Sequence, residues 1–416
     1  MVDSTAYSLA DFYNKGDKPL TELAAQFYEY QQDLLARGHM NYRRVSLTGS
    51  GPVVTILDHN GKTRDMLFFA SNDYLNLTKH PRTIAAGIAA CEKYGSGSGS
   101  VPLLGGTTDL HIELEKKVAR FKGCEASLLY SNGFGSNAGS LFALLGKQGC
   151  AICDMLIHAS LIDGCMGSNV EFFKHNDMGS LEMVLKRVKD KYVNKIVIVD
   201  GVYSMDGDIV PLDKVVELAH SYGALVMVDE AHATGVIGKN GRGTPEYFDI
   251  EGKVDIVAGT FSKGIGAVGG FIASTKEIIN YLFCYSRPYM FSTAITPQAA
   301  ASISAALDII QDEPELRKDL WRNIEYFRKG LKEIGVNTGN AETAIFPIIV
   351  GDDLKVKEMC RECHENGIYV NPVLYPAVSK RLARLRFSLM CKHTKEHLDY
   401  ALNFIEYLAK KYELVK

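Results

Sequence analysis

The sequence has no long apolar run, no strong excess of charge of one sign and no apolar segment at its start. No stretch reaches the roughly 18 consecutive apolar residues that a membrane-spanning helix needs. Polar residues, among them Asp3, Asp11 and Lys15, stand where a signal peptide would have its apolar core. The formal net charge of -3 offers no electrostatic basis for binding nucleic acid. These absences predict a cytoplasmic protein with no transmembrane segment and no nucleic-acid partner, and they leave peripheral contact with a membrane surface open.

Cysteine is present, but without the framework of a disulfide-rich or zinc-binding domain. The nine cysteines are an odd number and are spread along the chain, as in proteins with reduced thiols. Two pairs have the spacing of a zinc knuckle, Cys150 with Cys153 and Cys360 with Cys363. A zinc site would need both pairs to meet, yet the first runs into a predicted strand and the second lies on a predicted helix. We therefore predict no metal site.

The chain does contain a regular alternation of strand and helix signals. Between about residues 81 and 293, helical stretches separate short apolar runs. These runs span residues 126–130, 151–152, 195–199, 225–228 and 256–258. The alternation predicts an α/β protein with a mostly parallel sheet and helices on both faces. The 416 residues and 38 glycines suit several domains and many tight strand-to-helix turns.

Three segments are predicted along the chain. Residues 1–67 form an N-terminal helical segment and a hairpin around His59-Asn60-Gly61, which is a turn signal. Residues 68–297 form the large α/β domain. Residues 298–416 form a smaller α+β domain with a strand at 344–350 between helices.

The most informative feature is Lys263, which lies in the run Gly-Thr-Phe-Ser-Lys-Gly about thirty residues after Asp229. Both residues follow short apolar runs, so both are expected at the carboxyl ends of strands, where open α/β sheets bind ligands. A lysine can form a Schiff base with an aldehyde cofactor, and an aspartate can keep a pyridinium nitrogen protonated. Either residue alone is most often a surface lysine or a loop acid. The pair, in this order, indicates a site for pyridoxal phosphate (PLP) in the large domain.

Three further segments fit such a site. Gly133 and Phe134 follow a predicted strand and begin a helix, whose free N–H groups can hold a phosphate. His158 follows another strand, where it can stack on the cofactor ring, although a lone histidine is more often structural. Residues 200–208, Asp-Gly-Val-Tyr-Ser-Met-Asp-Gly-Asp, form a strand end and a loop that can lie beside the ring.

Taken together, these motifs resemble those of the α-oxoamine synthases. The matching runs are His-Ala-Ser at 158–160, the loop at 200–208, Asp-Glu-Ala-His at 229–232 and Gly-Thr-Phe-Ser-Lys at 259–263. The resemblance implies a fold-type I, aspartate aminotransferase-like PLP-dependent transferase that joins an amino acid to an acyl thioester with loss of carbon dioxide. Within the family, the bacterial serine palmitoyltransferase branch is the most similar, on segments 289–294, 371–378 and 386–390.

The resemblance implies a role for each matching residue. Lys263 would hold the cofactor and move the Cα proton, and Asp229 would pair with the pyridinium nitrogen. His158 would stack on the ring, and His232 would lie near its phenolic oxygen. These four are the expected catalytic residues. The other expected cofactor-binding residues are Gly133, Phe134, Ser204, Thr260, Ser262, Ser292 and Thr293.

The resemblance also implies partners. Ser292 and Thr293 would reach the phosphate of a neighbouring subunit, which makes a homodimer with shared active sites the expected active form. Arg386 would bind the substrate carboxylate, because its guanidinium fork matches carboxylate geometry. Asn72 is the second expected substrate-binding residue. Coenzyme A or acyl carrier protein would carry the acyl group.

The expected reaction is the condensation of L-serine, or a close analogue such as cysteate, with a long-chain acyl thioester to give a 3-keto long-chain base. This reaction is the first step of sphingolipid or sulfonolipid synthesis. One alternative is a short-chain α-oxoamine synthase that uses glycine or alanine, of the 2-amino-3-ketobutyrate ligase or 8-amino-7-oxononanoate synthase type. Another is a non-catalytic regulatory homologue, against which the joint presence of Lys263, Asp229 and His158 argues.

Two positions depart from the family pattern. Pro102 stands where an arginine is usual, in a loop expected at the substrate entrance. Because proline fixes φ and removes a donor, this change predicts a reshaped pocket that prefers a polar or anionic amino acid to glycine or alanine. Asn76 stands where a glycine is usual.

Overall fold

The computed structural model describes residues 2–14, 16–58 and 61–415. The chain forms two compact units. The large unit comprises Asn72–Ser204 and Asp208–Leu320, and the small unit comprises Met1–Ser71, Met205–Gly207 and Trp321–Lys416. The N-terminal and C-terminal segments therefore belong to one unit, with divisions at residues 71 and 320 where the sequence suggested 67 and 297.

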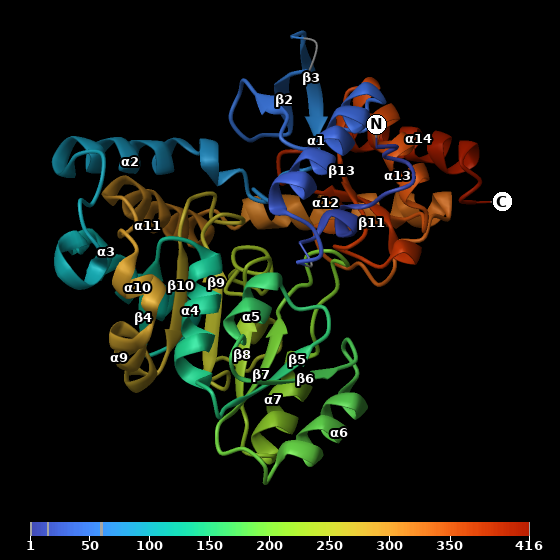
Figure 1. The fold of residues 1–416 in the computed structure, drawn as a ribbon. Helices are drawn as coiled ribbons and strands as arrows, with labels where there is room; N and C mark the ends of the chain where they lie inside the picture. The colour runs from blue at the N-terminus through green and yellow to red at the C-terminus, as the bar shows by residue number, and fades with distance from the viewer. Residues whose placement is uncertain (1, 15, 59–60, 416) are drawn as a thin grey trace. The chain divides into compact units, whose positions relative to one another are not determined.

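A seven-stranded sheet forms the centre of the large unit (Figure 1). The strands follow the order β4-β10-β9-β8-β7-β5-β6, and only β10 is antiparallel to its neighbours. The predicted α/β class with a mostly parallel sheet is confirmed. The strands are β4 (Ala126–Tyr130), β5 (Cys150–Asp154), β6 (Asn169–Phe173), β7 (Lys195–Asp200), β8 (Leu225–Asp229), β9 (Ile256–Thr260) and β10 (Gly270–Ser274).

Burial explains which strands the sequence revealed. Every residue of β5, β7, β9 and β10 is buried, so both faces of the sheet are covered there. The five predicted apolar runs fall on β4, β5, β7, β8 and β9. The sequence did not indicate β6, because this edge strand is only partly buried, or β10, because it begins with a glycine after another glycine.

Helices surround this sheet. They are α2 (Pro81–Tyr94), α3 (Asp109–Lys122), α4 (Gly133–Leu145), α5 (Ala159–Gly164), α6 (Met178–Val188), α7 (Leu212–Ser221), α8 (Thr244–Tyr247), α9 (Lys276–Tyr285), α10 (Arg287–Phe291) and α11 (Pro297–Asp312). α4 follows β4 directly and packs on β9 and β10, which places its N-terminus at the carboxyl end of the sheet. α11, which the sequence division assigned to the last segment, packs on α2 and α3 in the large unit.

The small unit contains two smaller sheets. One has the order β1 (Val45–Ser46), β2 (Val53–Leu57), β3 (Thr63–Phe68) and β12 (Ile368–Tyr369), and the other has the order β11 (Ile345–Ile349), β14 (Arg384–Ser388) and β13 (Asn371–Val373). β2 and β3 pair antiparallel, as a hairpin would, and the turn residues His59 and Asn60 lie outside the described residues. The helices are α1 (Leu20–Ala36), α13 (Asp353–Glu365) and α14 (Lys395–Lys411), with α12 (Glu315–Ile334) entering from the large unit.

Within the described ranges, no helix combines the length and apolar character that crossing a membrane requires. The same residues contain no group of three or more His, Cys, Asp or Glu placed to hold a metal ion. The two cysteine pairs lie on β5 and on α13, which belong to different units. The spacing within each pair says nothing about whether the two pairs meet, because that depends on how β5 and α13 are placed in the fold.

Candidate active site

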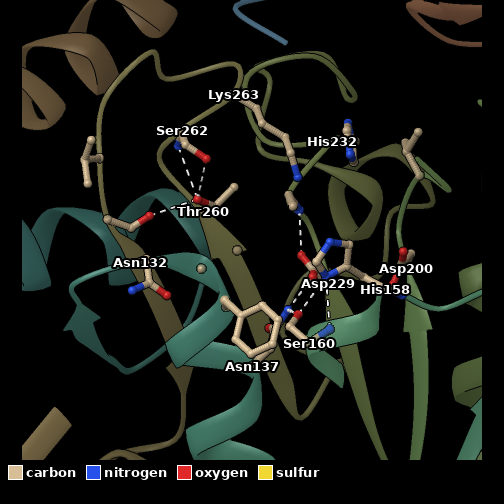
Figure 2. Close-up of a pocket in the computed structure, with 17 residues that line it drawn as sticks. Asn132, Asn137, His158, Ser160, Asp200, Asp229, His232, Thr260, Ser262 and Lys263 are labelled. Atoms are coloured by element: carbon tan, nitrogen blue, oxygen red, sulfur yellow. Dashed lines mark hydrogen bonds between the residues drawn. The ribbon is translucent and has the colours of Figure 1, made fainter. Parts of the chain in front are cut away.

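A cavity of about 270 Å³ lies at the carboxyl ends of β7, β8 and β9, beside the first residues of α4 (Figure 2). All the residues that line it belong to the large unit. The structure brings together in this cavity most of the residues that the sequence singled out. These are Gly133, Phe134, His158, Asp229, His232, Thr260, Ser262 and Lys263.

Backbone and hydroxyl groups line one side of the cavity. Asn132 caps α4 and accepts the Gly135 N–H at 2.6 Å. Thr260 Oγ1 lies 2.9 Å from Ser262 Oγ and accepts the Ser262 N–H at 3.2 Å. A Cβ on Gly133 would lie 2.7 Å from Thr260 Cβ, so only glycine lets the helix begin this close to β9. Free N–H groups at a helix start, together with hydroxyls, form a site suited to a phosphate.

Two acids lie on the opposite side, at the ends of adjacent strands. Asp229 and Asp200 are paired in register on β8 and β7. Asp229 Oδ1 accepts the Ala231 N–H at 2.8 Å, and Oδ2 accepts an Asn137 Nδ2 hydrogen at 2.6 Å. Burial, with the charge of Asp229 adding to it, raises the pKa of Asp200 well above its usual range. Asp229, by contrast, has two N–H donors directed at its carboxylate, one at each oxygen.

His158 lies beside these acids and caps the short helix α5. Its Nδ1 lies 2.8 Å from Ser160 Oγ and accepts the Ser160 N–H at 3.2 Å. Its main-chain N–H donates to Asp200 Oδ1 at 3.4 Å. Burial lowers the pKa of His158; Asp229 acts in the opposite sense, and Lys263 adds to the lowering. The imidazole is therefore biased toward its neutral form.

His232 is held from a segment far away in the sequence. Its Nδ1 lies 2.7 Å from the hydroxyl oxygen of the buried Tyr74, and that oxygen lies 3.4 Å from Asn72 Oδ1. Asn72 does not itself line the cavity, but it is linked through Tyr74 to a residue that does. In the same segment, Asn76 has a φ of 56°. Asparagine is one of the few residues other than glycine that adopt this left-handed conformation, which explains the exchange at this position.

Four other predicted residues do not line the cavity. Ser204 lies half-buried in the loop after β7, and Ser292 and Thr293 follow α10. The role expected for the last two concerns a second subunit, so one chain does not test it. Arg386 lies on β14 of the small unit, where its guanidinium donates to Ser388 Oγ at 2.9 Å. The roles of these residues remain predictions.

Sequence reasoning missed the side chains that hold the predicted ones. Asn137 and Asp229 are 92 residues apart in the sequence, and Tyr74 and His232 are 158 apart. One signal could have found Asn137, because it follows Gly133 by one helical turn and so shares its face of α4. No comparable spacing marks Tyr74.

The donor set of the cavity fits pyridoxal phosphate. Asp229 supplies a buried carboxylate for a ring N–H, and Lys263 supplies an amine for an aldehyde. The start of α4, with Thr260 and Ser262, supplies the N–H and hydroxyl donors that a phosphate requires. The sheet topology and this site together define a PLP-dependent enzyme of fold-type I.

The chain belongs to the aminotransferase class I and II family, whose model matches residues 64–405. It is 44% identical over 378 residues to 8-amino-7-oxononanoate synthase of Thermoanaerobacter pseudethanolicus, covering 90% of this chain and 94% of the relative. The structure of Sphingomonas wittichii serine palmitoyltransferase is similar with a TM-score of 0.89 at 31% identity, over 96% of this chain and 100% of that one. The structure of 8-amino-7-oxononanoate synthase from Francisella tularensis is similar with a TM-score of 0.72 at 28% identity, over 84% and 99%. These relatives are α-oxoamine synthases, so the predicted family, PLP cofactor and C-acyltransferase class are confirmed.

The expected long-chain branch, with serine or cysteate as the amino acid, is wrong. Further relatives at 42% and 39% identity also bear the name 8-amino-7-oxononanoate synthase, which corresponds to the short-chain alternative. The high TM-score to serine palmitoyltransferase does not alter this, because the family shares one backbone framework while side chains select the substrate. The preference inferred from Pro102 is withdrawn with the long-chain branch. In the structure, Pro102 begins a short helical turn (Pro102–Gly106).

Proposed function

We propose that this chain catalyses the PLP-dependent, decarboxylative condensation that forms 8-amino-7-oxononanoate. The observation that carries the proposal is the 44% identity over 90% of the chain to a relative of that name. The cavity supports it, because Lys263 and Asp229 both line it. The proposed reaction is a PLP-dependent acyl transfer whose product is neither a sphingolipid nor a sulfonolipid precursor.

The structure of the product identifies the substrates. The amine at carbon 8, beside a terminal methyl group, corresponds to alanine that has lost its carboxylate as carbon dioxide. The ketone at carbon 7 is the former thioester carbonyl, bonded now to the alanine Cα. The far end of the former acyl chain carries a carboxylate, which the product keeps. L-Alanine and a seven-carbon dicarboxylic acyl thioester therefore react, and carbon dioxide and the free thiol of coenzyme A or acyl carrier protein leave.

The side chains of this protein supply position and proton transfer. PLP, when bound, delocalises the negative charge that develops at the amino-acid Cα. Lys263 would hold the cofactor through its amine and take up the Cα proton. Asp229 would accept the hydrogen bond of the ring N–H, and Thr260 and Ser262 would bind the phosphate beside the start of α4. Arg386 would bind a substrate carboxylate.

The remaining predicted residues complete this proposal. His158 would stack on the ring, and His232 would lie near its phenolic oxygen, with Ser204 in the adjacent loop. Ser292 and Thr293 would complete the phosphate site of a neighbouring subunit in a cytoplasmic homodimer. If so, dilution to monomers should release the cofactor. A monomer that keeps full PLP occupancy and activity would rule out the shared site.

The reaction is tested by mass spectrometry of products from a panel of amino acids crossed with thioesters. The amino acids are L-alanine, glycine and L-serine, and the acyl groups are acetyl, the seven-carbon dicarboxylic group and palmitoyl, each on coenzyme A and on acyl carrier protein. We expect the highest thiol release with L-alanine and the dicarboxylic group, together with a product of the mass of 8-amino-7-oxononanoate. A higher kcat/KM with any other amino acid or acyl group would overturn the proposal.

A further inference from the structure

A continuous chain of hydrogen bonds links the His158 ring to the Asp229 carboxylate through two side chains without an assigned role (Figure 2). Asn137 Nδ2 donates to Asp229 Oδ2 at 2.6 Å and to Ser160 Oγ at 2.9 Å. Ser160 Oγ lies 2.8 Å from His158 Nδ1. Asn137 is 3% exposed and Ser160 is 0% exposed, so no bulk water competes for these bonds.

The direction of each bond in this chain follows from donor chemistry. A carboxylate only accepts, so Asn137 must turn its NH₂ group toward Asp229. The second hydrogen of that NH₂ group then reaches Ser160 Oγ, which accepts it. The Ser160 hydroxyl hydrogen is left for His158 Nδ1, and the Ser160 main-chain N–H points at the same nitrogen from 3.2 Å. Nδ1 is therefore an acceptor, and the ring proton lies on Nε2.

This orientation of the Asn137 amide has a cost, because its Oδ1 is buried without a hydrogen-bond partner among the described residues. A buried carbonyl left unpaired in a native structure calls for an explanation. The opposite orientation would pair Oδ1 with Ser160 but would set an oxygen against the Asp229 carboxylate. The observed orientation therefore makes two hydrogen bonds, one of them to Asp229, whereas the opposite orientation would make one and leave the NH₂ group unpaired.

The charged groups around His158 act on its pKa in opposite senses, and with burial the net effect is to lower it. Asp229 on β8 favours the imidazolium, while Lys263 and burial oppose it. Asp200 on β7 meets the His158 main chain, and its own carboxyl is biased toward the neutral form. Two donors directed at Nδ1 add a specific obstacle, because a proton on that nitrogen would face both of them.

We propose that Asn137 and Ser160 are positioning residues that hold the Asp229 carboxylate in one orientation and His158 as the neutral Nε2–H tautomer. This inference rests on the proposed function, which assigns the cavity to PLP. Asp229 would thereby be kept in position for the nitrogen of the cofactor ring, and His158 for the face of the ring. Neither positioning residue needs to touch the substrate.

The test measures the tautomer directly, in the cofactor-free protein, by ¹⁵N NMR of labelled histidine. The His158 signals are assigned from their absence in His158→Gln. In the wild type we expect an unprotonated Nδ1 and a protonated Nε2. Ser160→Ala and Asn137→Leu should raise the fraction of the other tautomer or of the imidazolium at the same pH, and Ser160→Thr, which keeps the hydroxyl, should restore the wild-type pattern.

The matched control is Ser140→Ala, because Ser140 is a buried serine on α4 whose hydroxyl meets only main-chain carbonyls, those of Ser136 at 2.6 Å and Asn137 at 3.1 Å, and none of the side chains in the chain of bonds. A control with the wild-type pattern supports the proposal. Unchanged His158 signals in both Ser160→Ala and Asn137→Leu would overturn it, and so would an equal change in the control. If one variant fails to fold, the other still decides.

Loaded enzyme gives a second readout. Ser160→Ala and Asn137→Leu should lower kcat about 10- to 100-fold with little change in the KM of the amino acid, as expected for residues that orient others. If the variants shift the tautomer but the wild type does not catalyse the proposed reaction, only the proposed function is wrong. If the wild type catalyses the proposed reaction but both variants keep the wild-type tautomer, only this inference is wrong.

Discussion

Asp229 and Glu230 are neighbours at the end of β8, but their carboxylates lie in opposite environments. Asp229 lines the cavity and is 5% exposed, and each of its oxygens accepts one N–H hydrogen bond. Glu230 does not line the cavity and is 0% exposed. Its Oε2 accepts the Thr244 N–H at 3.0 Å and lies 3.4 Å from Lys122 Nζ. Successive side chains of a strand point to opposite faces, so adjacent acids reach different surroundings.

Protein atoms surround the Glu230 carboxylate closely and leave it no room to bind a ligand. A Cβ on Gly243, whose φ is +110°, would collide with the Glu230 carboxylate. Lys122 Nζ also donates to Thr234 Oγ1 at 2.9 Å and to the Arg242 carbonyl at 2.7 Å. Burial raises the pKa of Glu230 and lowers that of Lys122, while their mutual attraction opposes both shifts. This is a closed, dry ion pair.

The difference shows that burial of a charge does not by itself mark a functional site. A carboxylate can accept about four hydrogen bonds, and the two made by Asp229 leave room for a ligand donor. The Glu230 carboxylate is surrounded by protein donors. Substitutions on the Asp229 side should therefore change turnover, and substitutions on the Glu230 side should change stability.

The largest effect is expected for Lys263→Ala. Turnover should fall on the order of 10⁴-fold or more, because we propose that this amine holds the cofactor and moves the proton, and alanine can do neither. The temperature of unfolding of the cofactor-free protein should stay close to the wild-type value. Borohydride reduction of the loaded wild type, followed by peptide mapping, should place the pyridoxyl group on Lys263. A label on any other lysine would contradict the assignment.

Lys122→Met tests the dry side. It leaves Glu230 buried without its cation, so the free energy of unfolding should fall by about 3–5 kcal/mol, measured by urea titration. Adding Glu230→Gln should recover most of this loss, because the unpaired charge disappears while the amide oxygen still accepts the Thr244 N–H and the amide NH₂ group can donate to Thr244 Oγ1. If Lys122→Met kept wild-type stability but lost turnover, the assignment of Glu230 to stability and of Asp229 to turnover would be wrong.

Asp229→Asn tests the cavity side with a nearly isosteric change. The amide cannot stabilise a positively charged ring nitrogen, so turnover should fall about 10²- to 10³-fold while PLP is still bound. Exchange of the alanine Cα proton into deuterated water, followed by NMR, measures the affected step. Near-wild-type exchange would show that Asp229 is not the partner of the ring nitrogen.

The smallest effect is expected at His175, which lies 3.0 Å from Asp154 Oδ1 and 2.8 Å from Asp208 Oδ2. Burial opposes its charge, but hydrogen bonds to the two carboxylates outweigh burial and raise the pKa of His175 from 6.5 to about 10. The imidazolium therefore stabilises the fold fully below about pH 6.5, and this contribution is lost as the pH rises through about 10. The stability difference between the wild type and His175→Gln should shrink over that range.

Urea titrations at several pH values measure this difference. His220→Gln is the matched control, because His220 is exposed and has a single carboxylate partner, Asp255, at 2.9 Å. A stability difference for His175→Gln that is constant from pH 6 to pH 10 would show that the two carboxylates do not hold a charged imidazole.

The sequence predicted the parallel part of the sheet well, because β5, β7, β8 and β9 are short apolar runs bounded by turns. It did not predict β10, which lies antiparallel between β9, close in the sequence, and β4, whose paired residues are 140 to 148 positions away. Pairing of this kind is set by tertiary contacts, which local composition does not encode.

By itself, the sequence determined the family and the cofactor, and it predicted a catalytic role for two residues, Lys263 and Asp229, that the structure brings together in one cavity. Each of them follows an apolar strand, and the carboxyl ends of parallel strands must meet at one edge of the sheet. Only the tertiary structure showed that the neighbouring Glu230 does not line the cavity, and only it revealed Asn137, Ser160 and Tyr74 as hydrogen-bond partners within the site. Hydrogen bonds between residues 92 or 158 positions apart depend on how strands and helices pack, so no local pattern records them.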